Sequence, residues 1–430
     1  MMKSINRSVA PAVSLPQAVR LPEVRSYILD NGLRVFLLDA GDQEVVKIDF
    51  AFKAGKWFET KNLVAEITNR MLREGVVGKS AFEIASQFEF YGCNLETSIS
   101  YTHSNIQLYS LAKHLNTALP LLFELFTAAS FPQDELQKLI TNRKQKLEER
   151  LAKTEFVANR TFVSAVWGPQ HPYGRLTTRE DLDALTREDL EAFYKTYYQP
   201  SRAFVIISGR ITAEAEQLFR QIFGQSQWEK SPIEQLPKEP VFFLAPAAQR
   251  NFYLPKANAV QSSVQCGMAT INKYHPDYDA LSILNTLFGG YFSSRLMANI
   301  REDKGFTYGI YSALSSFQHG GQFEITADVG VEVAAQTMEE ISREIERLHS
   351  SLVPDDELQT VKNYMAGKIL RSIDGPMKYS EVLRGLIQYQ RDGDYLNRYL
   401  QLIHAITPQR IQELAQQYLR WNEMVQVRVG

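Results

Sequence analysis

The sequence predicts an α+β protein of two homologous tandem domains, each a mainly antiparallel sheet covered by helices, facing each other across a cleft. The first observation behind this prediction is an internal repeat. Residues 186–209 match residues 407–430 at an offset of 221, and residues 132–136 match 354–358 at an offset of 222. The second observation is that strands and helices are grouped within each half, without the alternation of a doubly wound sheet.

Apolar spacing assigns the elements in order along the chain. Short apolar runs predict strands, and apolar residues that recur at three- and four-residue steps predict helices that face a core. In the first half the predicted elements are strands at 33–38, 45–52 and 204–208 and helices at 115–126, 136–151 and 187–197. The second half repeats this pattern with strands at 264–270, 323–329 and 424–429 and helices at 278–288 and 338–348.

The length of 430 residues suits the two domains that the repeat requires. We expect a flexible N-terminal arm at 1–22, a first domain at 23–224, a linker at 225–246 and a second domain at 247–430. The arm is basic and contains serines, as transit peptides do, but Pro11, Pro16 and Pro22 would break the amphipathic helix that such a peptide needs. The linker assignment rests on its prolines and charges.

Composition argues against several classes of protein. A net charge of −2 gives no general attraction to nucleic acid, and no apolar run reaches the length of a membrane span. Cys93 and Cys266 lie in different halves and outside any C-x-x-C spacing, so neither a disulfide framework nor a thiolate metal site is expected. We therefore expect a soluble globular protein in the cytoplasm, with an organelle or the periplasm as the alternatives.

Residues 288–308 are the segment whose residue types point most directly to chemistry. Arg301 falls in the last turn of a predicted helix, which Gly305 can end in the left-handed conformation, and Tyr308 lies on the strand that follows. Because the glycine reverses the chain, the guanidinium and the phenol can converge on one point. A fixed cation and a hydroxyl donor are suited to holding peptide carbonyls or an oxyanion.

Ordinary packing offers an alternative for this pair. An arginine near a helix C-terminus favours the helix dipole, and a tyrosine on a strand is common amphipathic packing. The repeat helps to separate the two interpretations. At an offset of 213, which aligns the glycines that end the two helices, Phe88 and Leu95 take the places of Arg301 and Tyr308. The fold itself therefore does not require polar groups there.

These features resemble those of the pitrilysin or insulinase family of zinc peptidases, which includes the mitochondrial processing peptidase. In that family a glycine-rich turn, a Ser-Ser-Arg-Leu helix start and an arginine seven residues before a tyrosine recur, as in residues 289–308 here. Residues 30–36, 171–174 and 186–209 resemble further parts of its first domain, so the resemblance covers nearly the whole chain. It implies the tandem fold and a substrate-binding role for Gly289, Gly290, Arg301 and Tyr308.

The zinc motif of the family is missing. Active members carry H-x-x-E-H on an early helix, where two histidines bind zinc and the glutamate acts as general base. The matching helix here has Glu66, Asn69 and Arg70 at the three motif positions. One carboxylate beside an arginine does not make a catalytic zinc site, which needs about three protein ligands.

The family's distant glutamate ligand matches Glu149, with Asn142 in place of the acidic residue seven positions earlier. By its residue type alone, Glu149 is equally a solvated helix charge or an ion-pair partner of Arg70. The seven histidines are never spaced at i, i+4, so they supply no substitute metal site. We expect no cofactor in this chain.

The resemblance therefore implies a non-catalytic subunit of a heterodimeric zinc metalloendopeptidase, with zinc in a homologous H-x-x-E-H partner subunit. Arg301 and Tyr308 would complete the partner's active site, and the substrates would be extended peptides added as a strand to a sheet edge. The alternative is a catalytically silent scaffold of the same fold, like the core proteins of a respiratory complex. A self-sufficient zinc peptidase is disfavoured by the residues at the motif positions.

Overall fold

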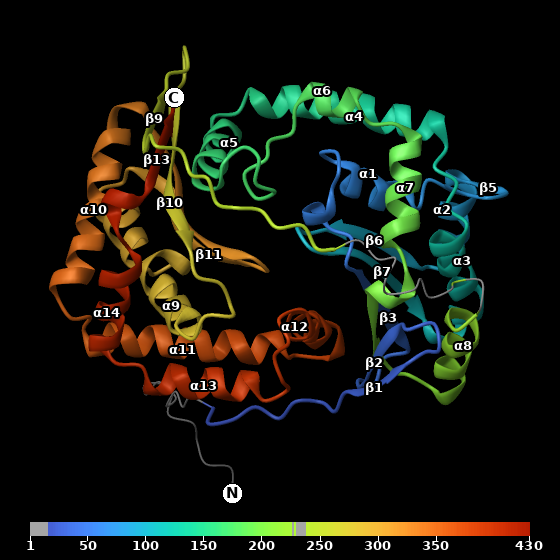
Figure 1. Cartoon of the computed structure of the whole chain (residues 1–430). Helices are drawn as coiled ribbons and strands as arrows, with labels where there is room; N and C mark the ends of the chain where they lie inside the picture. The colour runs from blue at the N-terminus through green and yellow to red at the C-terminus, as the bar shows by residue number, and fades with distance from the viewer. Residues whose placement is uncertain (1–15, 226–227, 229–237) are drawn as a thin grey trace, which may run out of the picture.

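The computed structural model describes residues 16–225, 228 and 238–430, and its two halves lie side by side, each built on one large sheet (Figure 1). The strand order in the first sheet is β1 (Arg25–Ile28), β2 (Arg34–Asp39), β8 (Ala203–Gly209), β3 (Val45–Phe52), β7 (Ser104–Leu111), β6 (Asn94–Ile99). The order in the second is β11 (Thr307–Phe317), β12 (Gly320–Gly330), β10 (Gln261–Thr270), β13 (Val425–Val429), β9 (Asn251–Leu254). Only β2–β8 and β13–β9 pair in parallel among the described strands of these sheets.

The two strand orders correspond element by element, because β6, β7, β3 and β8 follow one another as β11, β12, β10 and β13 do. The predicted α+β class with two homologous, mainly antiparallel halves is therefore confirmed. In both sheets the strand nearest the predicted site, β6 or β11, lies at the edge. A short hairpin of β4 (Gly75–Val76) and β5 (Lys79–Ser80) forms a separate two-stranded sheet.

Helices cover one face of each sheet in an equivalent way. The helices on the first sheet are α1 (Val64–Met71), α3 (Leu115–Thr127) and α8 (Ala213–Phe223). Those on the second are α9 (Tyr278–Asn285), α10 (Ala334–Ser350) and α14 (Pro408–Tyr418). The other helices are α2 (Ala81–Phe90), α4 (Gln133–Leu151), α6 (Arg179–Asp183), α7 (Arg187–Tyr197), α11 (Asp355–Ser372) and α13 (Tyr395–Ala405).

The opposite faces are covered by an exchange of helices between the halves. Helix α5 (Thr154–Trp167), from the first half, packs on β10 and β13 of the second sheet. Helix α12 (Pro376–Gln388), from the second half, packs on β8 and β2 of the first sheet. The 222-residue offset of the repeat relates these two helices. Each half therefore completes the core of the other, and the valines of β13 lie in the same apolar cluster as the first sheet.

Charged groups anchor α12 to the first sheet. Lys47 and Asp49 are fully buried on β3, and the Lys47 ammonium donates a hydrogen bond to the Ser380 hydroxyl at 3.2 Å. The Arg384 guanidinium donates to the Asp49 carboxylate at 2.7 Å. Burial raises the pKa of Asp49, while Arg384 and Lys47 oppose that shift. A buried carboxylate with two cations is costly to unpair, so it fixes the position of α12.

Part of the expected N-terminal arm is packed against the second half. Residues 1–15 lie outside the described residues, but Val19 is buried in the core of the second half. Its backbone amide donates to the Asn397 side-chain oxygen at 2.8 Å, and the ring of His404 lies 2.9 Å from the carbonyl oxygen of Pro16. The prediction of a flexible arm is therefore wrong for residues 16–22, because apolar and hydrogen-bonding groups hold them.

The described part of the expected linker follows the surface of the first half. Residues 226–227 and 229–237 lie outside the described residues. Trp228 is buried among the phenylalanines of the first core, and the Trp57 indole donates to the Pro240 carbonyl at 2.9 Å. Phe242 packs edge-on against Trp57. These aromatic contacts join residues 238–246 to the first half.

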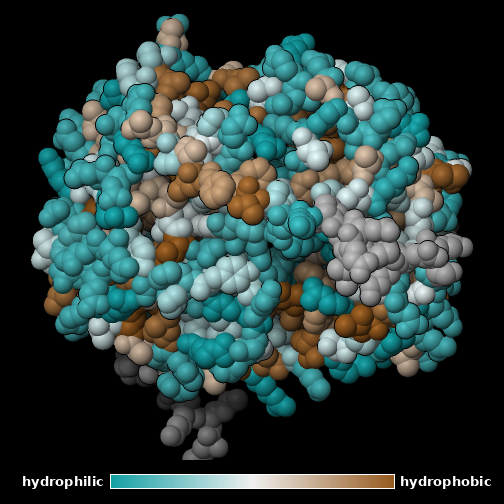
Figure 2. Space-filling model, in the orientation of Figure 1, coloured by the Kyte–Doolittle hydropathy of each residue, from teal (hydrophilic) through white to brown (hydrophobic). Residues whose placement is uncertain are grey.

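The surface seen in Figure 2 is mainly hydrophilic, with small, separate hydrophobic patches. Within the described residues, none of the helices is both long and apolar enough to cross a membrane.

Candidate functional site

Helix α1 brings the three degenerate zinc positions to one cavity. Asn69 and Arg70 follow Glu66 by three and four residues, about one helical turn, and all three line a cavity of about 530 Å³ beside edge strand β6.

Glu66 is held by two cations at the place where a metal would be expected. Its carboxylate lies 3.1 Å from the Lys56 ammonium and 2.7 Å from the Arg143 guanidinium. Burial alone would raise the pKa of Glu66, but Lys56 and Arg143 hold it below its usual range. The only carboxylate of the three positions is thus already neutralised by protein groups.

Asn69 and Arg70 have equally local partners. The Asn69 amide nitrogen donates to the backbone carbonyl of Ser98 on β6 at 2.7 Å, and its amide oxygen is buried without a partner in the described part of the chain. The Arg70 guanidinium lies 3.4 Å from Glu74. Burial, Arg73 and Arg143 all lower the pKa of Arg70, which shows how crowded the positive charge is.

Glu149 does not join this cluster. Its exposed carboxylate accepts a hydrogen bond from the Gln145 amide at 2.9 Å, so of the two ordinary interpretations the structure shows the solvated helix charge. The α4 residues that line the cavity are Leu139, Asn142, Arg143 and Lys146. Glu149 is not among them, so the structure does not place its carboxylate beside Glu66, Asn69 and Arg70, as a distant ligand of the same site would require.

This donor set does not fit zinc. A zinc site needs deprotonated nitrogen, sulfur or carboxylate ligands, whereas the cavity offers one ion-paired carboxylate, an amide, and cations that would repel the metal. Within the described ranges 16–225, 228 and 238–430, no group of three or more His, Cys, Asp or Glu side chains could hold a metal ion.

A second cavity of about 330 Å³ adjoins the first and shares Glu66, Arg143 and Lys146 with it. We call the two together the basic cavity. Its only acidic lining residue among those described is Glu66. Its basic lining residues are Lys56, Arg70, Arg143, Lys146, Arg150, Arg160 and Arg175. Sequence reasoning missed this cluster, although the spacing of Arg143, Lys146 and Arg150 along one helix face was a signal for it.

Arg301 and Tyr308 lie near the edge of the second sheet. Arg301 is in a π-helical segment, η6 (Met297–Asp303), and Gly305 ends it with a φ of 66°. The Arg301 guanidinium lies 4.6 Å from the centre of the Phe292 ring. Tyr308 sits at a bulge in β11 and is 94% exposed. No hydrogen bond from the guanidinium or the phenol is found within the described residues, so both groups are available to a ligand.

The equivalent positions in the first half are apolar and packed. Phe88 on α2 is buried in the first core, and Leu95 on edge strand β6 is half-buried against it. The same secondary structure thus carries a packed pair in one half and an available polar pair in the other.

Gly289 and Gly290 have a packing role. A Cβ atom on Gly289 would lie 2.6 Å from the Ser312 hydroxyl and 2.7 Å from the Ser312 amide nitrogen, both on β11. A Cβ atom on Gly290 would lie 3.0 Å from the Asn285 carbonyl oxygen. Gly289 lets the π-helical segment η5 (Thr286–Gly290) lie close to β11, and Gly290 packs against Asn285 at the end of α9. Their contact with substrate stays a prediction.

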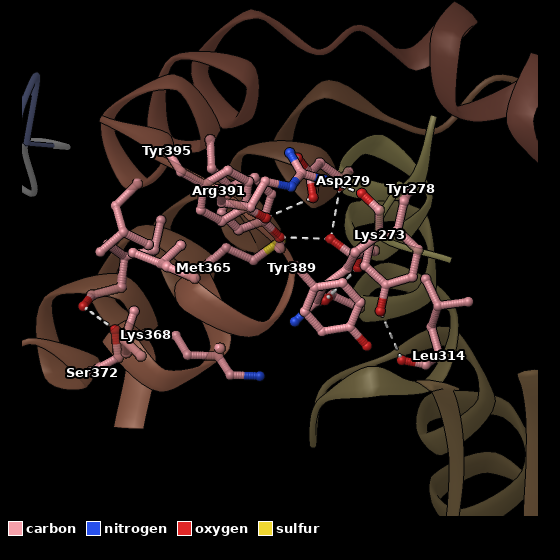
Figure 3. A pocket seen from close by; sticks show the side chains of 18 of the residues that line it. Lys273, Tyr278, Asp279, Leu314, Met365, Lys368, Ser372, Tyr389, Arg391 and Tyr395 are labelled. Atoms are coloured by element: carbon pink, nitrogen blue, oxygen red, sulfur yellow. Dashed lines mark hydrogen bonds and ion pairs between the residues drawn. The ribbon is translucent and has the colours of Figure 1, made fainter. Parts of the chain in front are cut away.

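A tyrosine-lined cavity of about 420 Å³ lies among α9, α11, α12 and α13 of the second half (Figure 3). The hydroxyls of Tyr278, Tyr389 and Tyr395 donate to the Leu314 carbonyl, the Ser316 carbonyl and the Asp279 carboxylate. The Lys273 ammonium lies 5.0 Å from the centre of the Tyr389 ring. Most of the tyrosine hydroxyls of this cavity are hydrogen-bonded to nearby protein groups. No sequence motif pointed to the cavity.

Comparisons with known proteins agree with this geometry. Residues 34–174 match the insulinase family (peptidase family M16), and residues 184–365 match the peptidase M16 inactive domain. An uncharacterized zinc protease of Bacillus subtilis, YmxG, is 25% identical to this chain over 82% of the chain and 85% of its own length. An uncharacterized zinc protease of Mycobacterium leprae is 27% identical over 83% of this chain and 80% of its own length.

Two solved structures share the fold. The peptidase M16 inactive domain from Pseudomonas fluorescens has a TM-score of 0.84 at 22% identity and covers 95% of this chain and 98% of its own. A protease from Helicobacter pylori has a TM-score of 0.85 at 19% identity and covers 96% of this chain and all of its own. Together the two family matches span most of the sequence, in the order of the two halves. The chain therefore belongs to the insulinase (M16) family of peptidases.

Proposed function

We propose that this chain is the non-catalytic subunit of a heterodimeric zinc metalloendopeptidase, and that it supplies Arg301 and Tyr308 to the active site of an H-x-x-E-H partner subunit. The observation that carries this proposal is the exposure of Tyr308, 94%, on an edge strand where the repeat has a half-buried leucine. A phenol that has no hydrogen-bond partner among the described residues and lies on an edge strand is placed to donate to a ligand that pairs with that strand.

The chemistry follows from the positions of the two side chains. An extended peptide that pairs with the open edge of β11 would run past Tyr308, whose phenol can donate a hydrogen bond to a carbonyl oxygen or to an oxyanion. Arg301, with five N–H donors in a fixed plane, can hold a neighbouring carbonyl. The partner subunit would hold the zinc ion, because the Glu66, Asn69 and Arg70 cluster does not fit one.

The scaffold remains the second candidate because of one contact. The Arg301 guanidinium lies over the ring of Phe292, which is itself 58% exposed, and such a cation–π contact would serve a purely structural helix end as well. In that case neither Arg301 nor Tyr308 would matter to peptide cleavage.

Reconstitution with the H-x-x-E-H partner tests the proposal. Tyr308→Phe should lower the turnover of the complex by roughly 10²-fold, the scale for losing one oxyanion donor, and Arg301→Ala should cost a similar factor. The matched control is Tyr253→Phe, because Tyr253 is also an exposed tyrosine but lies on β9, at the opposite edge of the same sheet. Thermal melts of each variant check that folding is intact. Unchanged turnover in both Arg301 and Tyr308 variants would leave the scaffold as the better account.

A further inference from the structure

The basic cavity of the first half carries much more positive charge than the chain as a whole. Seven basic side chains and one acidic side chain line it, while the net charge of the chain is −2. Glu66 already pairs with Lys56 and Arg143. Among the described residues, Lys146, Arg150 and Arg175 make no ion pair. An excess of unpaired, like charges around a concave surface is the signature of a site for anions.

Helix α4 shows that the excess is confined to the cavity face. Arg143, Lys146 and Arg150 follow one another on that face and line the cavity. On its other faces the lysines are paired, Lys138 with Glu135 at 2.8 Å and Lys144 with Asp183. On the cavity face only Arg143 is paired, with Glu66, whereas Lys146 and Arg150 make no ion pair among the described residues.

Two of the arginines are held in place before any ligand arrives. The guanidinium groups of Arg150 and Arg160 lie 4.1 Å and 5.5 Å from the centre of the Phe156 ring. Arg160 also donates to the Thr177 carbonyl at 2.8 Å. Burial and the nearby Arg150 lower the pKa of Arg160, so the two charges are close enough to repel. A carboxylate between them would relieve that repulsion at little cost in side-chain entropy.

A partly open strand edge lies beside these charges. Residues 97–99 of β6 line the cavity, and β6 is the edge strand of the first sheet, bonded on one side to β7. Two of its backbone carbonyls already accept side-chain donors, Ser98 from the Asn69 amide and Leu95 from the Arg73 guanidinium, so a peptide would pair with the other backbone groups of the strand. The unpaired backbone groups of an edge strand accept an extended peptide, and the side chains of such a peptide alternate in direction. A peptide on this edge would point every second side chain into the basic cavity.

We propose that the basic cavity is a binding site for the acidic side chains of an extended peptide paired with β6. The inference deepens the proposed function and rests on it for the substrate role, since it names acidic peptide segments as the class of substrate. Binding itself needs only this chain, because all the charges and the strand edge belong to it.

The test measures direct binding to the full chain without a partner. The probes are a fluorescently labelled, glutamate-rich extended peptide and the same peptide with glutamine in place of glutamate, followed by fluorescence anisotropy. We expect the acidic peptide to bind roughly tenfold more tightly or better, and the difference to shrink as ionic strength rises, because salt screens exposed charges.

Paired charge reversals locate the site. The double variant Lys146→Glu and Arg150→Glu should lose roughly tenfold in affinity for the acidic peptide and little for the glutamine peptide. The matched control, Lys138→Glu and Lys195→Glu, makes the same change in net charge on exposed residues outside the cavity. All four residues are on helix surfaces, and circular dichroism confirms that each variant is folded.

Three results would overturn the inference: equal affinity for the two peptides, an equal loss in the control variant, or displacement of the acidic peptide by inorganic phosphate as readily as by unlabelled peptide. The last result would show a site for small anions only.

The failure of this inference can be told apart from the failure of the proposed function. If the peptide fails to bind while Tyr308→Phe still slows the reconstituted pair, only this inference fails. If the peptide binds while that variant has full turnover, only the Arg301 and Tyr308 mechanism fails.

Discussion

Helix α2 with strand β6 in the first half and segment η6 with strand β11 in the second have the same place in their sheets, yet they present opposite surfaces. The first pair carries Phe88, buried in the core, and Leu95, half-buried against it. The second carries Arg301 and Tyr308, which form no hydrogen bond within the described residues. The apolar pair occupies the equivalent place in the repeat, on an α-helix rather than a π-helical segment, so polar side chains are not a general requirement of that place in the fold. The comparison teaches that polar residues without hydrogen-bond partners in one copy of a repeat, where the other copy has packed apolar residues, are the ones to test for function.

The cavities of the two halves differ in a similar way. The basic cavity lies between α1 and α4, and the tyrosine-lined cavity lies against α9 and α11, the equivalent helices. Lys146 and Lys368, related by the 222-residue offset, line one cavity each. In the second half, tyrosine hydroxyls bond to Ser282 and Asp279, and the carboxylates of Asp279 and Glu381 accompany the cations of the lining. In the basic cavity, Glu66 is the one carboxylate among the described lining residues. Duplication preserved the hollow, and the side chains around it diverged.

The largest expected effect separates the packed pair from the available pair. Phe88→Ala should lower the free energy of unfolding by about 3–5 kcal/mol, because it leaves a cavity in the first core. Arg301→Ala, at the equivalent place, should change it by less than about 0.5 kcal/mol. Urea unfolding of both variants measures the difference. Equal destabilisation would mean that Arg301 is a structural residue and that the contrast between the halves is wrong.

The exchanged helices should respond strongly to loss of their charged anchor. Arg384→Ala leaves the buried Asp49 carboxylate with Lys47 as its one nearby cation and Gln107 as its hydrogen-bond donor, and we expect a loss of about 3 kcal/mol in the free energy of unfolding. Lys378→Ala is the control on the same helix, since that exposed side chain lies 4.0 Å from an exposed aspartate. If both variants unfold at the same urea concentration, α12 is held by its apolar face instead.

Acid should loosen the aromatic cluster where the halves meet. His171 stacks on Trp167, and its Nδ1 accepts a hydrogen bond from the Tyr173 amide, as only a neutral ring can. Burial, followed by His319 and Arg175, lowers the pKa of His171 to about 4, while an unfolded histidine titrates near 6.5. Its stabilisation is therefore complete above about pH 6.5 and is lost as the pH falls toward 4, on the order of 2 kcal/mol.

Urea unfolding at neutral pH and near pH 4.5 measures this loss. The free energy of unfolding should fall less between the two pH values in His171→Gln than in the parent. His103, whose pKa burial lowers to about 3, contributes in the same direction. Glu59 opposes both, because burial raises its pKa to about 7 and its neutral form favours the fold in acid. Comparing the variant with the parent at each pH removes these shared contributions. An equal fall in the variant and the parent would mean that His171 titrates alike in the folded and unfolded chain.

The last prediction is that restoring the zinc motif does not by itself create zinc binding. The triple variant Glu66→His, Asn69→Glu and Arg70→His restores the H-x-x-E-H letters, but Arg143 and Lys146 still face that position from α4. We therefore expect metal analysis to find no stoichiometric zinc in either the parent or the triple variant. Adding Lys146→Glu should be needed before zinc binds. Zinc in the triple variant alone would show that α4 does not control the site.

Much of this protein was predictable from local patterns in the sequence. The repeat offsets and the apolar spacing predicted two α+β halves, and the predicted helix at 187–197 coincides with α7. The helix end at Gly305 was also predictable, since only a residue without a side chain enters that conformation easily. The predicted helix at 278–288 continues from α9 into a π-helical segment, because Gly289 packs closely on β11.

The sequence by itself determined the fold class, the family and the loss of the zinc ligands, because these depend on residue types at fixed spacings along one element. Only the tertiary structure decided the rest, because it depends on which elements meet. The exchange of α5 and α12 follows from sheet faces that need a cover, and only the packed structure shows that Lys146 of α4, and not Glu149, lines the cavity beside α1. The basic cavity arises in the same way, since its charges come from segments as far apart in the chain as Lys56 and Arg175, and folding brings them together.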